Sequence, residues 1–309
     1  MQELFTLFKD DGRRWFKGNT HTHTTCSDGV RTPEEAADWY RRAGYDFLFL
    51  TEHEQKLATP AALPDFEKLS SREMLVLPGL ELYLDLDDPP DRTLHVAALG
   101  TAKTGVWRPQ WSFRRTIEFV LGEEGLPVIA HPYYNAVIDQ EIADAHGCAA
   151  IEVFNTTCDV ACGKGFCRSH WDFLLRRGIA IHGVAADDAH WCRQIPDYGK
   201  GWVMLKAESL SLRSILDGLR DGSFYASTGP EFLDVSMTQG EVRVRTSPAA
   251  RINFISDNGY SSVEHAVDGR AITCARRELS SFRKFLRLEC VDAQGRFAWT
   301  NAVILGQPE

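Results

Sequence analysis

The chain has 309 residues, of which 44% are hydrophobic and 25% charged, an ordinary balance for a globular protein with a sizeable core. Intrinsic disorder and collagen-like architecture are therefore excluded. The chain has 34 Lys and Arg residues and 43 Asp and Glu residues, which give a net charge of −9. This charge disfavours an extended binding surface for duplex nucleic acid. No apolar run is long enough for a membrane span, and residues 1–19 carry charges where a signal peptide needs its apolar run, so we expect a cytoplasmic protein.

The chain contains eight cysteines, which in a reducing cytoplasm are expected to be free thiols. Cys158, Cys162 and Cys167 form a loose cluster. Their spacing, with no second Cys pair elsewhere, does not match a structural zinc site.

Short apolar runs alternate with amphipathic stretches over the first two thirds of the chain. The runs are typical of buried parallel strands and occupy residues 47–51, 74–81, 94–100, 126–132, 149–155 and 179–187. Helices are expected between them. Thr32 followed by Pro33 is typical of a capped helix start, and Gly44 of a stop. Repeated strand-then-helix units predict an α/β barrel or an open parallel sheet.

The pattern changes near Gly229-Pro230. Beyond this point apolar and polar residues alternate and are interrupted by Gly, Asn and Asp, as in a half-buried antiparallel sheet. We therefore expect an α/β unit at 1–228, followed by a small all-β, sandwich-like domain at 229–309.

Histidines and carboxylates gather at or just beyond the ends of the predicted strands. These residues are His21, His23, Asp28, His53, Glu81, His95, His131, Asp188 and His190. The C-terminal ends of parallel strands meet at one mouth of a barrel, so we expect these nine side chains to converge. A single histidine is often only a core residue, but that does not explain the whole set. Imidazole nitrogens together with carboxylate oxygens suit zinc, manganese or iron.

The same segments resemble the motifs of a known family. Residues 15–23, continued by Cys26-Ser27-Asp28-Gly29, resemble the first motif of the polymerase and histidinol phosphatase (PHP) family, and Leu50-Thr51-Glu52-His53 resembles its second. Residues 78–81, 130–132 and 187–190 resemble its later motifs. The resemblance covers about residues 13–228. It implies a distorted (β/α)7 barrel with two to three divalent metal ions at its mouth.

The resemblance also implies a set of ligands for each ion. His21, His23, Glu81 and Asp188 would hold the first metal, and Asp28, His53 and His190 the second. His95 and His131 would hold a third, with Glu81 as a bridge to the first. Glu52 departs from the family, which usually has Asp before this histidine, so the surroundings of His53 are expected to differ.

Further segments narrow the resemblance. Residues 170–178, 201–203 and 224–230 resemble the two-domain, carbaryl-hydrolase-like branch of the family, in which a β-sandwich follows the barrel. This agrees with the alternating pattern at the C-terminal end of the chain.

The chemistry expected of such a cluster is hydrolysis by a metal-activated hydroxide, with no Ser or Cys nucleophile. We expect a phosphoesterase that acts on a small phosphorylated substrate such as a nucleotide, or on short oligonucleotides. Hydrolysis of a carbamate or carboxylic ester by the same metals is the alternative, and a non-catalytic metal-containing binding protein is a third. His170 is a candidate general acid, although a surface residue at a helix start is the other interpretation.

Overall fold

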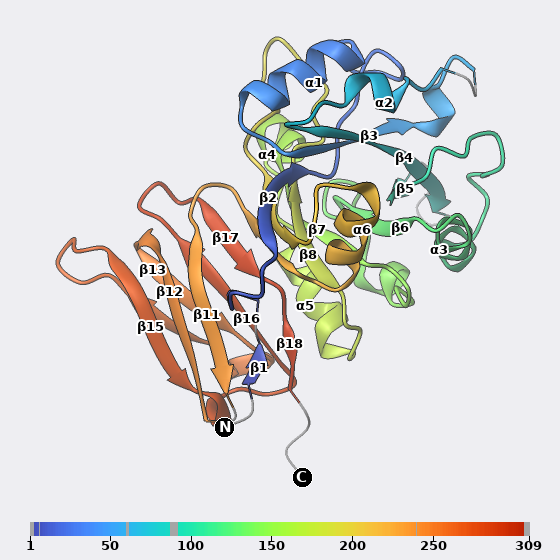
Figure 1. The fold of residues 1–309 in the computed structure, drawn as a ribbon. Coiled ribbons are helices and arrows are strands. Elements are labelled where there is room, and N and C mark those ends of the chain that lie inside the picture. The colour runs from blue at the N-terminus through green and yellow to red at the C-terminus, as the bar shows by residue number, and fades with distance from the viewer. Residues whose placement is uncertain (1–2, 6, 60–61, 87–91, 239, 306–309) are drawn as a thin grey trace.

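The computed structural model describes residues 3–5, 7–59, 62–86, 92–238 and 240–305 (Figure 1). One large mixed sheet contains most of its strands. In the order in which they pair, they are β14 (Ser262–His265), β13 (Arg251–Ile255), β16 (Phe285–Val291), β17 (Phe297–Thr300), β10 (Phe224–Ser227), β9 (Trp202–Ala207), β2 (Arg14–Asn19), β3 (Phe47–His53), β4 (Leu75–Leu86), β5 (Arg92–Leu99), β6 (Leu126–Ala130), β7 (Ala150–Asn155) and β8 (His182–Ala186). The short β18 (Val303–Ile304) pairs with β16.

Figure 1 shows the labelled helices gathered around the β2–β8 part of this sheet. They are α1 (Pro33–Arg42), α2 (Phe66–Leu69), α3 (Phe113–Gly122), α4 (Thr156–Cys162), α5 (Arg168–Arg176) and α6 (Leu212–Arg220). Among the described residues, no helix is long and apolar enough to cross a membrane.

The predicted start of α1 is confirmed in atomic detail. The Thr32 side chain accepts a hydrogen bond from the Glu35 N–H, and the Glu35 carboxylate accepts one from the Thr32 N–H. This reciprocal capping satisfies two backbone donors at the helix start. The helix buries Ala36 and Tyr40 in an apolar cluster shared with β3 and β4, and so fixes the position of the strands that carry His53 and Glu81.

All six predicted apolar runs form strands, but they are not all parallel. β5 is antiparallel to both β4 and β6. The prediction of a fully parallel arrangement was therefore wrong at this strand. Because β5 is reversed, its first half lies beside the later part of β4 and the end of β6, with His95 opposite Tyr83 and Ala130.

The segments that follow β2 and β8 form an isolated bridge with each other. The His23 N–H donates to the carbonyl of Ala189 at 3.0 Å, and the Asp188 N–H donates to the carbonyl of His21 at 2.9 Å. Within the described residues, β2 and β8 do not themselves pair, so the sheet is joined here only by this short bridge. The bridge brings the two His- and Asp-containing segments together.

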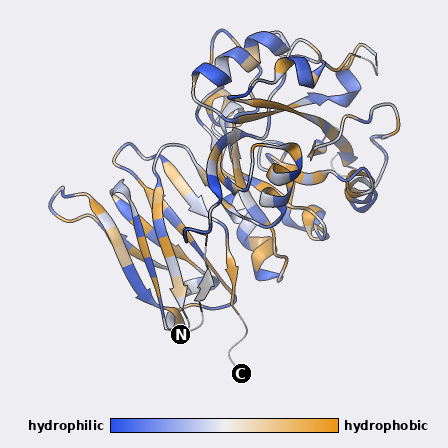
Figure 2. Ribbon diagram, viewed as in Figure 1, coloured by the Kyte–Doolittle hydropathy of each residue, from blue (hydrophilic) through white to orange (hydrophobic). Residues whose placement is uncertain are grey.

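A second, four-stranded sheet consists of β1 (Glu3–Phe5), β11 (Phe232–Thr238), β12 (Glu241–Ala249) and β15 (Ile272–Glu278). Its buried side chains, such as Val235 and Val244, share an apolar core with Phe254 and Leu288 of the large sheet. Figure 2 shows hydrophilic and hydrophobic residues alternating along these strands. The N-terminal β1 pairs with β11, so residues 3–5 lie in this sheet. From the sequence, these residues were expected to lie in the α/β unit.

A buried ion-pair network connects β16 to α5. Nε and Nη2 of Arg287 donate to the two carboxylate oxygens of Asp172 at 2.8 and 3.0 Å, and Nη1 donates to Glu289 at 2.7 Å. Arg287 is only 1% exposed and also lies over the ring of Trp171. The network therefore fixes a helix of the α/β part to the C-terminal strands.

Candidate metal centre

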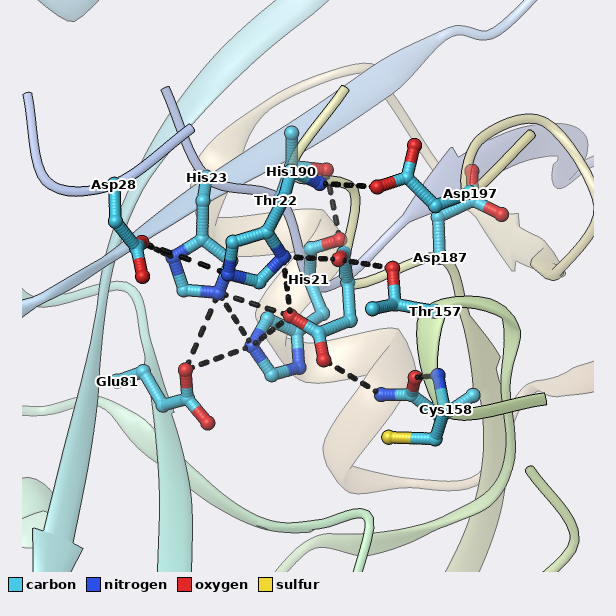
Figure 3. A network of polar contacts seen from close by, with 12 residues as sticks. His21, Thr22, His23, Asp28, Glu81, Thr157, Cys158, Asp187, His190 and Asp197 are labelled. Carbon is cyan, nitrogen blue, oxygen red and sulfur yellow. Dashed lines mark hydrogen bonds and ion pairs between the residues drawn. The ribbon is translucent and has the colours of Figure 1, made fainter. Parts of the chain in front are cut away.

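The nine side chains singled out in the sequence all lie at one edge of the α/β part. His21 and His23 follow β2, His53 ends β3, and Asp188 follows β8. Glu81 lies within β4, directly opposite His53 on the neighbouring strand. Figure 3 shows the rings of His21, His23 and His190 gathered with the carboxylates of Asp28 and Glu81.

The ligand-type atoms of these residues and of Glu152 form overlapping groups, and within each group all atoms lie within 4.8 Å of one another. The groups are His21, His23, Glu81 and Asp188; His23, Asp28, His53 and His190; Glu81, His95 and His131; and His21, His131 and Glu152. The first three contain the three ligand sets that the family resemblance implies. His23 lies in the second group as well as the first, and Glu81 lies in both the first and the third.

The ligand-type atoms of the first group face one another, and some of them have no hydrogen-bond partner. His23 Nε2 lies 3.0 Å from Asp188 Oδ1 and 3.2 Å from Glu81 Oε2, and it faces His21 Nε2 at 3.1 Å. Yet, among the described residues, Glu81 Oε2, Asp188 Oδ1 and His23 Nδ1 are buried without a hydrogen-bond partner. Buried polar atoms normally have partners. Lone pairs that converge in this way fit a divalent cation bound between them.

The carboxylates change the protonation of the histidines around them. Burial disfavours the charged form of His23, but Asp188 and Glu81 outweigh it and raise its pKa to about 9. The pKa of His131 is raised to about 9 in the same way, with Glu81 as the main partner opposing burial. Burial lowers the pKa of His53 to about 3. Without metal, the site therefore holds protons on some ligands that a cation has to displace.

Glu152, in the middle of β7, also belongs to the cluster, although the sequence patterns do not single it out. Its Oε1 lies 2.6 Å from Nδ1 of His21, and its Oε2 accepts the backbone N–H of His131 at 2.9 Å. A carboxylate behind a histidine ligand fixes the ring orientation and the tautomer. The available signal was a single acid within the apolar run 149–155.

Glu52, which differs from the usual residue of the family motif, accepts hydrogen bonds from the segment before Asp28. Its buried carboxylate accepts the backbone N–H of Thr24 at 3.1 Å and the hydroxyl of Ser27. The longer side chain therefore supports the loop that presents Asp28.

Two of the clustered residues have unusual backbone conformations. His131 and Asp188 have φ values of 26° and 55°, a region that non-glycine residues rarely adopt. Each is fixed by a backbone hydrogen bond, to Glu152 and to His21 respectively. Such conformations cost free energy and are concentrated at functional sites.

The structure does not bring His170 to the cluster. This residue lies in α5, where its Nε2–H donates to the carbonyl of Val137 at 2.9 Å. It is not among the residues that line the cleft above the cluster. The structure therefore gives His170 no contact with the cleft in which the expected general acid would act.

A cleft of about 240 Å³ opens above the cluster. Besides the ligand-type side chains, it is lined by Lys56, Tyr134, Thr157, Cys158 and Ala161. A larger hollow of about 830 Å³ lies on the four-stranded sheet and contains none of the nine clustered residues. The small cleft therefore gives external molecules access to the candidate ligands.

Comparison with known structures identifies a protein of similar fold. A crystal structure from Bacteroides vulgatus ATCC 8482, described as a two-domain protein containing a predicted PHP-like metal-dependent phosphoesterase, superimposes with a TM-score of 0.56. The alignment has 16% identity and covers 94% of this chain and 96% of that one. The chain has the fold of a two-domain PHP-like protein. The resemblance seen in the motifs is thus confirmed at the level of a mixed α/β fold with a large central sheet.

The chain is also similar in sequence to a curated protein. The DNA polymerase/3'-5' exonuclease PolX of Bacillus subtilis (strain 168) is 26% identical over 239 residues. The match covers 65% of this chain but only 40% of the relative. No protein-family model matches the chain.

Proposed function

We propose that this protein is a metal-dependent phosphoesterase that hydrolyses a small phosphorylated substrate, such as a nucleotide, with two to three manganese, zinc or iron ions. The observation that supports it is the convergence of nine His, Asp and Glu side chains, among which buried atoms of His23, Glu81 and Asp188 lack hydrogen-bond partners. The descriptions of the two similar proteins, a metal-dependent phosphoesterase and an exonuclease, favour the same chemistry.

The side chains have separate roles in this proposal. His21, His23, Glu81 and Asp188 hold one ion, Asp28, His53 and His190 a second, and His95 and His131 a third shared with Glu81. Such ions lower the pKa of bound water and polarise phosphoryl oxygens. Glu152 keeps the proton of His21 on Nδ1, which leaves Nε2 free to act as a ligand.

The cleft favours a small substrate or the end of a short oligonucleotide. Its volume of about 240 Å³ suits a phosphoryl group and part of a leaving group. The net charge of −9 opposes extended contact with duplex nucleic acid. We also propose a cytoplasmic location, because all eight cysteines are free thiols. A reducing compartment keeps cysteines in this state.

Metal analysis and turnover with simple chromogenic esters test the proposal. We expect two to three metal ions per chain, and hydrolysis of p-nitrophenyl phosphate or bis-p-nitrophenyl phosphate. His21→Ala should lose both metal and turnover. His265→Ala, which changes an exposed histidine on β14, serves as the matched control and should retain both.

Other outcomes contradict the proposal in distinct ways. Full metal occupancy with cleavage only of carbamates or carboxylic esters would favour the alternative hydrolase. Bound metal without turnover of any ester would favour a non-catalytic binding protein. No bound metal after supplementation would contradict every one of these functions.

A further inference from the structure

Lys56 is the one Lys or Arg side chain among the described residues that line the cleft. It lies three residues beyond His53, at the end of the single helical turn Glu54–Lys56 that follows β3. Its side chain is 48% exposed. The ammonium group is therefore at the mouth of the cleft, where it can contact both solvent and an entering molecule.

The present partner of Lys56 is itself a candidate metal ligand. Lys56 Nζ lies 2.5 Å from Asp28 Oδ2. The same carboxylate lies 3.5 Å from His190 Nε2 and 3.7 Å from His53 Nε2. Once Asp28 binds a divalent cation, Lys56 shares its anion with a second positive charge. It then gains electrostatic energy by pairing with an anion that enters the cleft.

We propose that Lys56 binds the phosphoryl group of the substrate and makes the site selective for dianionic phosphate monoesters over phosphodiesters and uncharged esters. This inference rests on the proposed function and specifies its substrate class. A lysine ammonium offers three donors and a compact charge on a flexible stem, which suits phosphoryl oxygens that bind no metal. A diester has one negative charge fewer, and a carbamate or carboxylic ester has none, so neither gains as much from this contact.

A purely structural role predicts a different behaviour. If Lys56 only neutralises Asp28 in the metal-free protein, its removal changes the affinity for metal and leaves the affinity for phosphate unchanged. If Lys56 binds substrate, its removal weakens phosphate binding while the metal ions stay in place. The two roles are separated by measuring both affinities on the same variants.

The chain offers a closely matched control. Lys103 forms an ion pair with Glu123, and the two side chains are 48% and 28% exposed, against 48% and 30% for Lys56 and Asp28. Lys103 does not line the cleft. Lys103→Met therefore removes an equivalent surface ion pair without changing the candidate site.

The test compares Lys56→Met, Lys56→Arg and Lys103→Met in the manganese-loaded full chain, at saturating Mn²⁺. Calorimetry measures the binding of inorganic phosphate, and elemental analysis measures bound manganese. We expect Lys56→Met to retain manganese, to bind phosphate about tenfold more weakly, and to raise KM for p-nitrophenyl phosphate more than for bis-p-nitrophenyl phosphate. Lys56→Arg should retain most of the phosphate affinity, and Lys103→Met all of it.

Unchanged phosphate affinity in Lys56→Met overturns the inference, and so does an equal rise in KM for the monoester and the diester. A wild-type protein that binds manganese but neither binds phosphate nor hydrolyses phosphate esters contradicts the proposed function itself. The wild-type measurements therefore test the proposed function, and the comparison with Lys56→Met tests the inference.

Discussion

Glu152 Oε1 lies 2.6 Å from His21 Nδ1, on the opposite side of the ring from Nε2, which faces Glu81 and Asp188. The other oxygen of Glu152 accepts hydrogen bonds from the His131 N–H and from Asn155 Nδ2. Both oxygens of this carboxylate are therefore committed. Its position determines which nitrogen of His21 carries the proton.

The first prediction follows from this geometry. In Glu152→Gln the amide oxygen must take the position of Oε2, which accepts two donors, so the amide NH₂ faces His21 Nδ1. That donor drives the ring proton to Nε2, the nitrogen that faces the candidate metal position. We expect a loss of metal affinity of about 10- to 100-fold, measured by competition with a chelator. Glu289→Gln, an acid outside the cluster, should not cause this loss.

The second prediction concerns pH. His23 and His131, with pKa values raised to about 9, are protonated at pH 7 in the metal-free protein and must lose their protons to bind a cation. Apparent metal affinity should therefore fall as the pH falls from 9 to 6. His53, whose pKa is lowered to about 3, should contribute nothing over this range. Calorimetry at pH 7 in buffers of different ionisation enthalpy should detect proton release, and its absence would contradict the assignment.

The third prediction concerns stability. A metal ion that binds only the folded chain stabilises it, by about 2.7 kcal/mol per site at a hundredfold excess over Kd. We expect Mn²⁺ or Zn²⁺ to raise the Tm and EDTA to lower it. In Asp188→Asn, which changes a buried carboxylate of the first group, the shift should be much smaller. Equal shifts in the two proteins would show that the ions bind elsewhere.

The fourth prediction concerns the network between β16 and α5. Arg287→Met leaves Glu289, which is only 2% exposed, without its main cationic partner. The expected loss is about 3 kcal/mol in the free energy of unfolding, measured in urea. The double variant Arg287→Met/Glu289→Met should recover most of it, because no buried charge then remains unpaired. Metal content should not change in either variant.

Much of the candidate site could be predicted from the sequence because its residues follow strands that are easily recognised. Unbroken apolar runs identify buried strands. Polar residues directly after such runs lie at the C-terminal ends of the strands. His53, His131 and Asp188 are all of this kind. Their convergence therefore needed only the rule that the ends of such strands meet.

Other features depend on pairing between distant segments, which a pattern along the chain does not encode. His95 lies near the middle of its strand, and it reaches the cluster only because β5 is reversed against both neighbours. An apolar run has the same appearance in either direction. The misplacement of His170 has a similar cause, since its hydrogen bond to Val137 joins segments 33 residues apart. The pairing of β1 with β11 crosses most of the chain.

The large sheet continues from the strands beside the cluster into the C-terminal strands. β10 pairs with β9 on one side and with β17 on the other, with Tyr225 opposite both Met204 and Thr300. A chain cut after residue 228 would lose β17 and expose the backbone donors and acceptors of Phe224–Ser227 along an open edge. Such an edge is a template for pairing with other chains. The C-terminal strands thus cover an edge of the α/β part that would otherwise favour aggregation.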